Sequence, residues 1–537
     1  MRAPTSTPTA FAMVALGIVA GVTLDLLTPA ASDAPATTAA GPAVSGTWHC
    51  AAGDTATGNG MFVITAVPPG SATGSVVRVD TVGGGEISRG AEAEVFAGGL
   101  RVDGLPPERT EAGVWARWWR TPAAVTRVWV RGQAGEPAGL VEGPCVAEPS
   151  PTWYLPGVNT AGGAQAALSL VNPFDVDAAV AVDLLTPDGV QRPERLKNVG
   201  IPARTVKTIP LNEHAPELAD LGAVVRLRAG RVVAEAWQSV DPAVGGVEGL
   251  TLAPLAPAPQ DTWTIPWFRT GDAESWLWVA NASESPASLA VTVHTPDGGA
   301  PPEGLEELTV PGESVRRIDL RGALPEDARS AGVTVTSANG VPVVVSAATR
   351  ITNPDPERTG FAIQLGEPDV DPQWVISTGP LRGRHEVLHL VNPTSEPVTV
   401  EIIAASATST VSPEDWRQVA VPPGTAIDIN ISAAGDDLDQ HAIFVQADGG
   451  GVVAGLHSVE RSGRMRLLAR AGVPSRVWAG GQPVPPVRFA PGLPQRLGTS
   501  LGTAIRSETI TDVQDVPTPT ASPVDGAADT TEPRAAR

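Results

Sequence analysis

The chain has 537 residues, a formal net charge of −21 and a pI of about 4.8. This acidic balance argues against a nucleic-acid-binding protein, which would be expected to carry a basic face. The 57 glycines and 53 prolines interrupt the chain too often for long helices. They favour short strands joined by many turns.

An apolar run, Ala10 to Leu27, follows Arg2 at the N-terminus. Its uninterrupted part, Phe11 to Leu24, has the length of a signal peptide and is short for a membrane span. Ala34-Pro35-Ala36 offers a small-residue cleavage site. We therefore expect residues 1–30 to be a hydrophobic helix that directs export, either as a cleaved signal peptide or as an uncleaved membrane anchor. Residues 31–46 would form a linker.

The chain contains two cysteines, Cys50 and Cys145. In an exported protein a lone pair of cysteines is most simply explained by a disulfide. The alternative is a pair of unpaired buried thiols.

Tryptophans recur at spacings of 104 to 111 residues, at Trp48, Trp153, Trp263, Trp374 and Trp478. This period is too long for a small solenoid repeat or one propeller blade, and it matches an immunoglobulin-like sandwich. We assign one sandwich each to residues 152–259, 262–370 and 373–484, and a diverged one to residues 47–148. These segments are called repeats 1 to 4 in chain order. Trp478 could also begin a truncated fifth unit.

Repeats 2 to 4 share a strand that ends at Asn172, Asn281 or Asn392, and a proline follows each asparagine 30 residues later. The Ala167–Gly189 stretch predicts two strands in a hairpin-like pair that closes in a Thr-Pro-Asp-Gly turn. A second hairpin is expected to close each repeat, because an Ala-Gly, Asn-Gly or Asp-Gly step separates two apolar strands. These hairpins are predicted at residues 222–240, 332–351 and 442–459, with about seven strands per repeat.

The sequence therefore predicts an all-β fold of tandem immunoglobulin-like antiparallel β-sandwiches. An N-terminal hydrophobic helix precedes them. Residues 485–537, rich in Pro, Thr and Asp, are expected to be a disordered C-terminal tail.

Together the motifs W-x-x-x-G, L-x-L-x-N-P and T-P-D-G resemble repeats of exported bacterial surface proteins. The whole layout, over roughly residues 45–480, is similar to an exported actinobacterial family, the domain of unknown function 5719. This resemblance implies a secreted multi-repeat β-sandwich protein. Because its motifs are structural, it implies no catalytic residue.

One motif, His385-Glu386-Val387-Leu388-His389, matches the H-E-x-x-H pattern of zinc proteases. That chemistry needs a helix, which brings both imidazoles to one face a single turn apart. Here the motif falls on a repeated strand, where the two histidines would lie about 13 Å apart at ~3.3 Å per residue. We therefore predict no metal, no cofactor and no catalytic residue, and we expect His389 to face outward as surface decoration.

Trp115, Arg117 and Trp119 of repeat 1 are expected on the outward face of one strand. Two exposed tryptophans flanking an arginine could stack on sugar rings or anchor a protein partner. The alternative is that they pack on a neighbouring repeat or under a loop.

These observations favour a non-catalytic, extracytoplasmic protein, secreted or held in the cell membrane by its N-terminal segment, that is a structural or binding module of the cell envelope. One alternative is a carbohydrate- or protein-binding accessory factor in envelope assembly. Another is a cryptic hydrolase with an inter-domain site. The expected partner is an envelope protein or glycan, with no nucleic acid.

Overall fold

The computed structural model of the chain describes residues 44–51, 58–67, 74–95, 99–104, 112–131, 139–241, 247, 249–305, 307–324, 328–352, 359–378, 384–406, 410–434, 441–460, 466–479 and 482–483. Residues Met1–Val484 group as one compact unit and Pro485–Arg537 as a second. The predicted N-terminal helix, most of the predicted linker and the predicted disordered tail lie outside the described residues. Within the described residues, no helix has the length and apolar character needed to cross a membrane.

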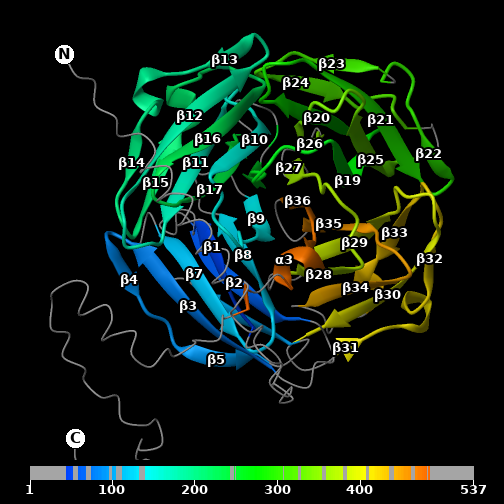
Figure 1. Cartoon of the computed structure of the whole chain (residues 1–537). Helices are drawn as coiled ribbons and strands as arrows, with labels where there is room; N and C mark the ends of the chain where they lie inside the picture. Colours follow the sequence, from blue (N-terminus) through cyan, green and yellow to red (C-terminus); the bar gives the residue numbers. More distant parts are fainter. Residues whose placement is uncertain are drawn as a thin grey trace, which may run out of the picture. The chain divides into compact units, whose positions relative to one another are not determined.

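The prediction of an all-β fold is confirmed, because each repeat folds into two antiparallel sheets (Figure 1). In repeat 1 the first sheet has the order β38-β1-β7-β3-β4, with β5 beside β3, and the second sheet has the order β6-β2-β8-β9. The bounds are β1 Val44–Ala51, β2 Gly58–Ala66, β3 Ser75–Gly83, β4 Glu86–Ser88, β5 Glu92–Val95, β6 Leu100–Gly104, β7 Gly113–Trp119, β8 Ala123–Arg131, β9 Gly139–Pro144 and β38 Gln482–Pro483.

Repeats 2 and 3 have the same plan. Their first sheets are β10-β16-β12-β13, with β14 beside β12, and β19-β25-β21-β22, with β23 beside β21. Their second sheets are β15-β11-β17-β18 and β24-β20-β26-β27. The bounds in repeat 2 are β10 Thr152–Val158, β11 Ala164–Asn172, β12 Ala178–Thr186, β13 Gly189–Gln191, η1 Glu194–Leu196, β14 Val199–Ile201, β15 Thr205–Pro210, η2 Leu211–Glu213, β16 Leu221–Ala229, β17 Val233–Val240 and β18 Gly249–Ala253. The bounds in repeat 3 are β19 Thr262–Arg269, β20 Ala273–Asn281, β21 Ala287–Thr295, β22 Gly298–Ala300, β23 Leu308–Val310, β24 Ser314–Asp319, β25 Ser330–Ser337, β26 Val344–Ile351 and β27 Gly360–Leu365.

Repeat 4 follows this plan and adds a short helix. Its sheets are β31-β30-β34-β28-β37, with β32 beside β30, and β33-β29-β35-β36. The bounds are β28 Gln373–Ser377, β29 Arg384–Val391, β30 Val398–Ala405, β31 Thr410–Val411, η4 Glu414–Trp416, β32 Val419–Val421, β33 Ala426–Asn430, η5 Ile431–Ala434, β34 Ala442–Asp448, β35 Val453–Glu460, β36 Arg466–Ala471, β37 Val473–Pro474 and α3 Ser475–Trp478. Trp478 thus lies on α3 and not on a strand that would begin a fifth sheet.

Both hairpin predictions are wrong, because the two strands of each predicted hairpin do not pair with each other. β11 and β12, which form the Ala167–Gly189 stretch, belong to different sheets, and so do β16 and β17. The apolar alternation and the turn residues do mark chain reversals, since Gly189 and Gly230 have positive φ values of 117° and 73°. Gly189 lies in a hairpin between β12 and β13 of one sheet, whereas Gly230 lies in a connection that crosses from β16 to β17 on the facing sheet. In each repeat the chain therefore crosses between the two facing sheets, and these connections link the sheets across the core.

The strand order also differs from an immunoglobulin domain at its outer strands. In that fold the first strand pairs with the second, and the last pairs with the strand before it. In repeat 2 the first strand β10 instead pairs with β16, and β17 pairs with β11. Relative to an immunoglobulin domain, β10 and β17 have therefore exchanged sheets. β18 adds one further strand beside β17. With the short strands β13 and β14, repeat 2 has nine strands rather than the expected seven.

The asparagine that ends the second strand of repeats 2 to 4 is fully buried and ties two segments together. In repeat 3 the Nδ2 of Asn281 donates to the carbonyls of Ser285, Val310 and Pro311 at 2.8, 3.2 and 3.1 Å. Its Oδ1 accepts the amide of Ser283 at 3.0 Å. Asn172 and Asn392 make equivalent contacts. The 30-residue spacing in the sequence therefore reflects a hydrogen bond that reaches the region of the later proline.

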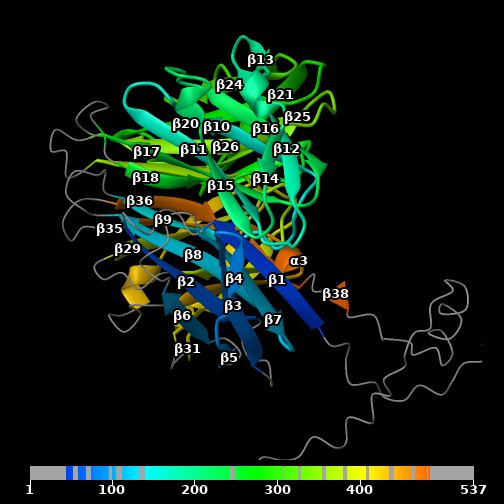
Figure 2. The ribbon, with the colours of Figure 1, turned by 90° about the vertical axis from the view of Figure 1, so that its left-hand side faces the viewer.

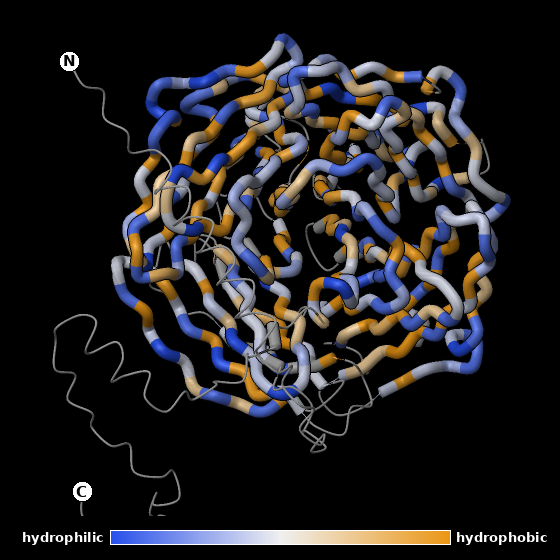
Figure 3. Tube along the Cα trace, in the orientation of Figure 1, coloured by the Kyte–Doolittle hydropathy of each residue, from blue (hydrophilic) through white to orange (hydrophobic). Residues whose placement is uncertain are grey.

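The periodic tryptophans also have one shared role. The first four, Trp48, Trp153, Trp263 and Trp374, each lie on the first strand of their repeat and are buried, whereas Trp478 lies on α3. Each of the four donates its indole N–H to a backbone carbonyl at or just before the start of β8, β17, β26 or β35. The pairs are Trp48 with Ala123, Trp153 with Val232, Trp263 with Val343 and Trp374 with Val452, at 2.6, 3.3, 2.7 and 2.8 Å. Repeat 1, although diverged, keeps this contact. Along the strands, apolar and polar residues alternate, as a two-sided sheet requires (Figure 3).

Within this unit the repeats contact one another in a closed order. The first sheet of each repeat packs on the second sheet of the next, with β1 on β11, β10 on β20 and β19 on β29. β28 of repeat 4 in turn contacts β8 of repeat 1. The last strands β9, β18, β27 and β36 also contact each other in sequence, and β36 returns to β9. Figure 2 shows β9, β18 and β36 next to one another.

The contact between repeats 4 and 1 is stabilised by hydrogen bonds and a buried ion pair. β38 pairs with β1, and the hydroxyls of Thr65 and Ser377 lie 2.7 Å apart. Arg384 of repeat 4 forms a buried ion pair with Glu142 of repeat 1 at 2.8 Å. These contacts join residues more than 240 positions apart in the chain.

Candidate binding site

Trp115, Arg117 and Trp119 lie on one face of β7. They are half-buried, whereas Val114, Ala116 and Trp118 on the opposite face are buried in the core. The alternation places the three side chains away from the interior of repeat 1. The three side chains nevertheless have different surroundings, because repeat 2 covers only one end of this face.

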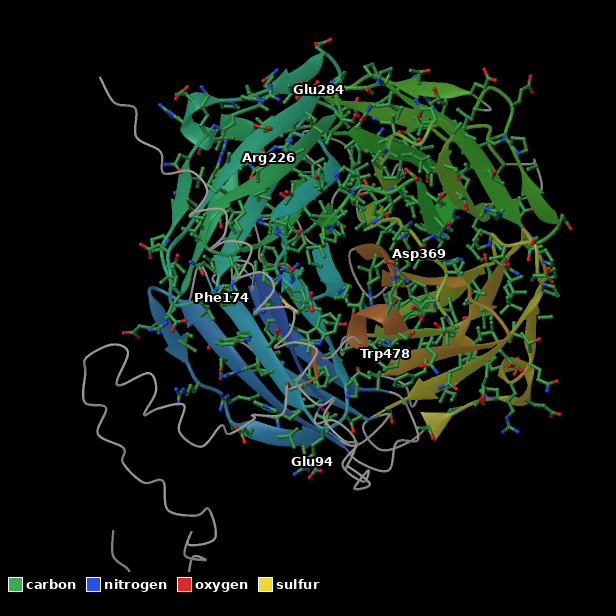
Figure 4. The ribbon with its side chains drawn as sticks, in the orientation of Figure 1. Glu94, Phe174, Arg226, Glu284, Asp369 and Trp478 are labelled. Atoms are coloured by element: carbon green, nitrogen blue, oxygen red, sulfur yellow. A yellow bond between two sulfur atoms is a disulfide. The ribbon has the colours of Figure 1, made fainter. Side chains whose placement is uncertain are left out.

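The Trp115 end of the face is covered. Trp115 stacks on the imidazole of His49 with ring centroids 6.1 Å apart, and His49 in turn contacts the ring of Phe174 from repeat 2 at 5.8 Å. Phe174 is labelled in Figure 4. The guanidinium of Arg231 lies 3.9 Å above the ring of Phe174. Burial, with a smaller contribution from Arg231, lowers the pKa of His49 to about 4. This part of the face is therefore an interface between repeats.

The Arg117 end of the face is fixed by a buried carboxylate. Arg117 pairs with Asp80, which is fully buried and also lies 3.3 Å from the Nε of Arg78. The guanidinium of Arg117 lies 4.3 Å from the ring of Trp115, and that of Arg78 lies 5.8 Å from the ring of Trp119. The two tryptophan rings and the two arginines thus form one ladder across β3 and β7.

A pocket of about 820 Å³ opens beside this ladder. It is lined by parts of β1 and β7, by the connection from Pro144 to Pro151, by residues after β18, and by α3. Arg117 and Trp119 line it and Trp115 does not. Of the three residues singled out in the sequence, the structure brings two to the pocket.

The pocket wall is rich in aromatic and proline side chains. Trp48, Trp118, Trp153 and Trp478 contribute to it, as do five prolines: Pro144, Pro149, Pro151, Pro254 and Pro257. Val477 of α3 also lines it and is 39% exposed, and Val176 is the other large hydrophobic residue that is exposed among the described residues. Figure 4 shows Trp478 on α3.

Three of the charged residues that line the pocket, Arg117, Glu235 and Arg476, have partners of opposite charge, and Glu148 is a fourth charged lining residue. Glu235 is buried and accepts from Arg127 at 2.7 Å. Arg476 pairs with Glu367 at 2.5 Å and lies 3.5 Å from Asp371. Burial raises the pKa of Glu367 to about 7 even though Arg476 opposes the shift. The lining therefore presents apolar surface with its main charges neutralised in pairs.

The sequence signalled little of this pocket in advance. Part of its lining comes from the connections between repeats and from a four-residue helix, α3, which carry no repeated pattern, although the periodic Trp48 and Trp153 also line it. The carboxylate of Asp371 holds α3 in place by accepting the amides of Ser475 and Arg476 at 3.0 and 3.1 Å. The prolines of the connections, the periodic Trp48 and Trp153, and Arg117 and Trp119 of β7 were the available signals.

The H-E-x-x-H segment is a strand, β29, as predicted. The prediction that His389 is surface decoration is wrong, because its side chain is buried against repeat 3. It does point away from the core of repeat 4, but the neighbouring repeat covers that face. Glu386 lies on the other face of β29, where Arg384 and His441 are within 3.2 and 2.9 Å of its carboxylate. In the described part of the chain, no group of three or more His, Cys, Asp or Glu residues is placed to hold a metal ion.

The predicted disulfide is confirmed, joining Cys50 on β1 to Cys145, which directly follows β9. It thereby holds the connection that lines the pocket against the first strand of repeat 1.

A family model described as a family of unknown function, DUF5719, matches residues 119–373 and 366–473. The chain belongs to the DUF5719 family. A search among curated proteins found no relative that matches. The DUF5719 match includes Trp119, Trp153 and the H-E-x-x-H segment. Trp48, Arg117 and Trp478 lie outside it, so residues beyond the matched ranges complete the pocket.

Proposed function

We propose that this DUF5719 protein is a non-catalytic, exported module of the cell envelope, and that it binds a glycan or protein ligand in the pocket beside Trp119. The pocket of about 820 Å³ is the observation that carries this proposal. Its volume falls within the range of roughly 300–1,000 Å³ that is common for ligand sites, and its wall is mainly aromatic and aliphatic. Tryptophan faces are suited to sugar rings and to apolar anchors of a protein.

The electrostatics support binding over hydrolysis. A hydrolase needs polar groups that converge on a reacting atom and are available to move protons. Here Arg117, Glu235 and Arg476 are each engaged with a partner of opposite charge. Orientation by shape and by apolar contact is the chemistry that such a lining favours.

Export rests on the sequence of residues 1–46, which is largely outside the described residues. Cell fractionation with N-terminal sequencing of the mature chain tests it directly. Recovery of the full chain in the cytosol would contradict the proposal.

The binding test uses two matched valines. Val477→Asp places a charge at the pocket, and Val176→Asp places the same charge at an exposed valine that does not line it. Purified protein and both variants are applied to a glycan array and to immobilised cell-envelope proteins. We expect Val477→Asp and Trp119→Ala to weaken binding about 30-fold, as for a contact worth about 2 kcal/mol. Val176→Asp should bind like the original chain. Equal binding by Val477→Asp and Val176→Asp would remove the pocket from the proposal.

A further inference from the structure

Three titratable side chains form a chain of hydrogen bonds across the second sheet of repeat 4. Asp428 on β33, His389 on β29 and His457 on β35 come from three adjacent strands. The Nδ1 of His389 lies 2.6 Å from Oδ1 of Asp428. The Nε2 of His389 lies 2.6 Å from Nδ1 of His457. Both nitrogens of His389 are therefore engaged.

Repeat 3 closes over this chain. Trp267 of β19 is 1% exposed and stacks on His457, with ring centroids 4.6 Å apart and planes 11° from parallel. The ring of Trp267 also lies 6.0 Å from His389. Ser330 of β25 donates its hydroxyl to Asp428 at 2.7 Å. The chain of three residues is thus part of the interface between repeats 3 and 4.

The number of protons on the two imidazoles decides whether both hydrogen bonds can form. With both histidines neutral, Nδ1–H of His389 donates to Asp428 and Nδ1–H of His457 donates to Nε2 of His389. A proton added at Nε2 of His457 allows the Nδ1 proton to pass to His389. His389 is then an imidazolium that donates to both neighbours, and His457 stays neutral. One proton therefore reverses the direction of one hydrogen bond and breaks none.

A second proton has a different result. Both facing nitrogens of His389 and His457 would then carry hydrogens, so their hydrogen bond is lost and two cations lie side by side. Among these three residues, only the carboxylate of Asp428 can balance the two positive charges. The other charged or titratable groups facing His457 are His385 on β29 and Arg269 on β19, and Arg269 is paired with Asp272 at 2.6 Å. Neither adds negative charge.

We propose that Asp428, His389 and His457 form a proton-operated latch between repeats 3 and 4, which stays closed with one bound proton and opens with the second. Acidification then loosens this interface, whereas the contact between repeats 2 and 3 stays intact.

The direction of the titration supports the latch. Burial, followed by the charge of His389, holds the pKa of His457 well below its usual value. Burial alone would raise the pKa of Asp428, but the hydrogen bond and charge of His389 bring it below its usual value. The open state binds one more proton than the closed state below about pH 6.5, so closure weakens as the pH falls through that value. From about pH 6.5 to pH 5, one extra proton shifts the opening equilibrium by up to about 30-fold.

Hydrogen exchange of the full chain measures this opening. Protection of amides in β19, β29 and β35 is compared at pH 7.5 and pH 5, after correction for the intrinsic rate. We expect a loss of about 10- to 30-fold in these strands and less than about threefold in β10 and β16 of repeat 2, which face repeat 3. His457→Gln keeps a side-chain N–H that can reach Nε2 of His389 and cannot titrate, so its loss should be below about threefold. His214→Gln in repeat 2 is the matched control and should behave as the original chain.

Two results would overturn the latch. One is unchanged protection of β29 and β35 at pH 5 in the original chain. The other is the same acid-induced loss in His457→Gln. If His457→Gln does not fold, NMR titration of the original chain with labelled histidine decides the matter. The latch requires one ring of the pair to stay neutral well below pH 6.5, and two rings that both titrate near pH 6.5 would refute it.

Discussion

The buried asparagine of repeats 2 to 4 gives the sharpest test of how the sandwiches are held together. In Asn281→Ala, one side-chain amide that donates to three carbonyls and accepts one amide is removed. The amide has only two hydrogens, so at most two full donated bonds and one accepted bond are lost. At about 1 kcal/mol for each of these three bonds, we expect a loss of about 3 kcal/mol in the free energy of unfolding.

Asn339 provides the matched control. It too uses its side chain to bridge backbone groups, donating to the carbonyl of Pro286 at 2.9 Å and accepting the amide of Ser288 at 3.0 Å. It is exposed, so water replaces these bonds after Asn339→Ala, and the cost should stay below about 1 kcal/mol. Urea unfolding followed by circular dichroism measures both variants. Equal costs for the two substitutions would refute the argument, because burial is the main difference between the sites.

Two further substitutions test the contacts between repeats. Gly157→Ala would place a Cβ 2.1 Å from the ring of Trp278 in repeat 3, so we expect a loss of about 1–3 kcal/mol in urea unfolding. Gly200→Ala, where nothing lies within 4 Å, should cost no more than about 1 kcal/mol, and equal costs would show that the close approach is not limiting. Glu142→Ala removes the buried carboxylate that pairs with Arg384 and should cost about 3–5 kcal/mol, because a buried cation loses its partner. Hydrogen exchange should place the loss at β9, β29 and β36, and a loss confined to repeat 2 would contradict this closure of repeat 4 on repeat 1.

Much of the site's architecture could be anticipated from local pattern. The alternation on β7 placed Trp115, Arg117 and Trp119 together on one face, and the repeat placed the H-E-x-x-H segment on a strand. These predictions hold because side-chain direction along a strand depends only on the local backbone. Local sequence pattern does not predict which other part of the molecule covers each outward face. Trp115 and His389 both point outward from their own repeat, yet each is covered by the neighbouring one.

The pairing of strands was also beyond the reach of local pattern. A Gly-containing reversal between two apolar strands predicts a hairpin, whereas β16 and β17 face each other across the core. Both arrangements bury the same apolar residues and need the same positive φ at Gly230. Only the partners available on each side, β10 and β12 for β16 and β11 and β18 for β17, decide between them.

The sequence alone determined the repeat and its period, the all-β class, the disulfide and the outward direction of the residues in question. It did so because a conserved spacing within one chain reports contacts that are made anew in every repeat, such as the indole and asparagine hydrogen bonds. The tertiary structure decided which repeats touch, where the pocket opens and how His389, His457 and Asp428 meet. Those features join residues from different repeats or from connections without a pattern, and each occurs once, so no periodicity in the sequence could reveal them.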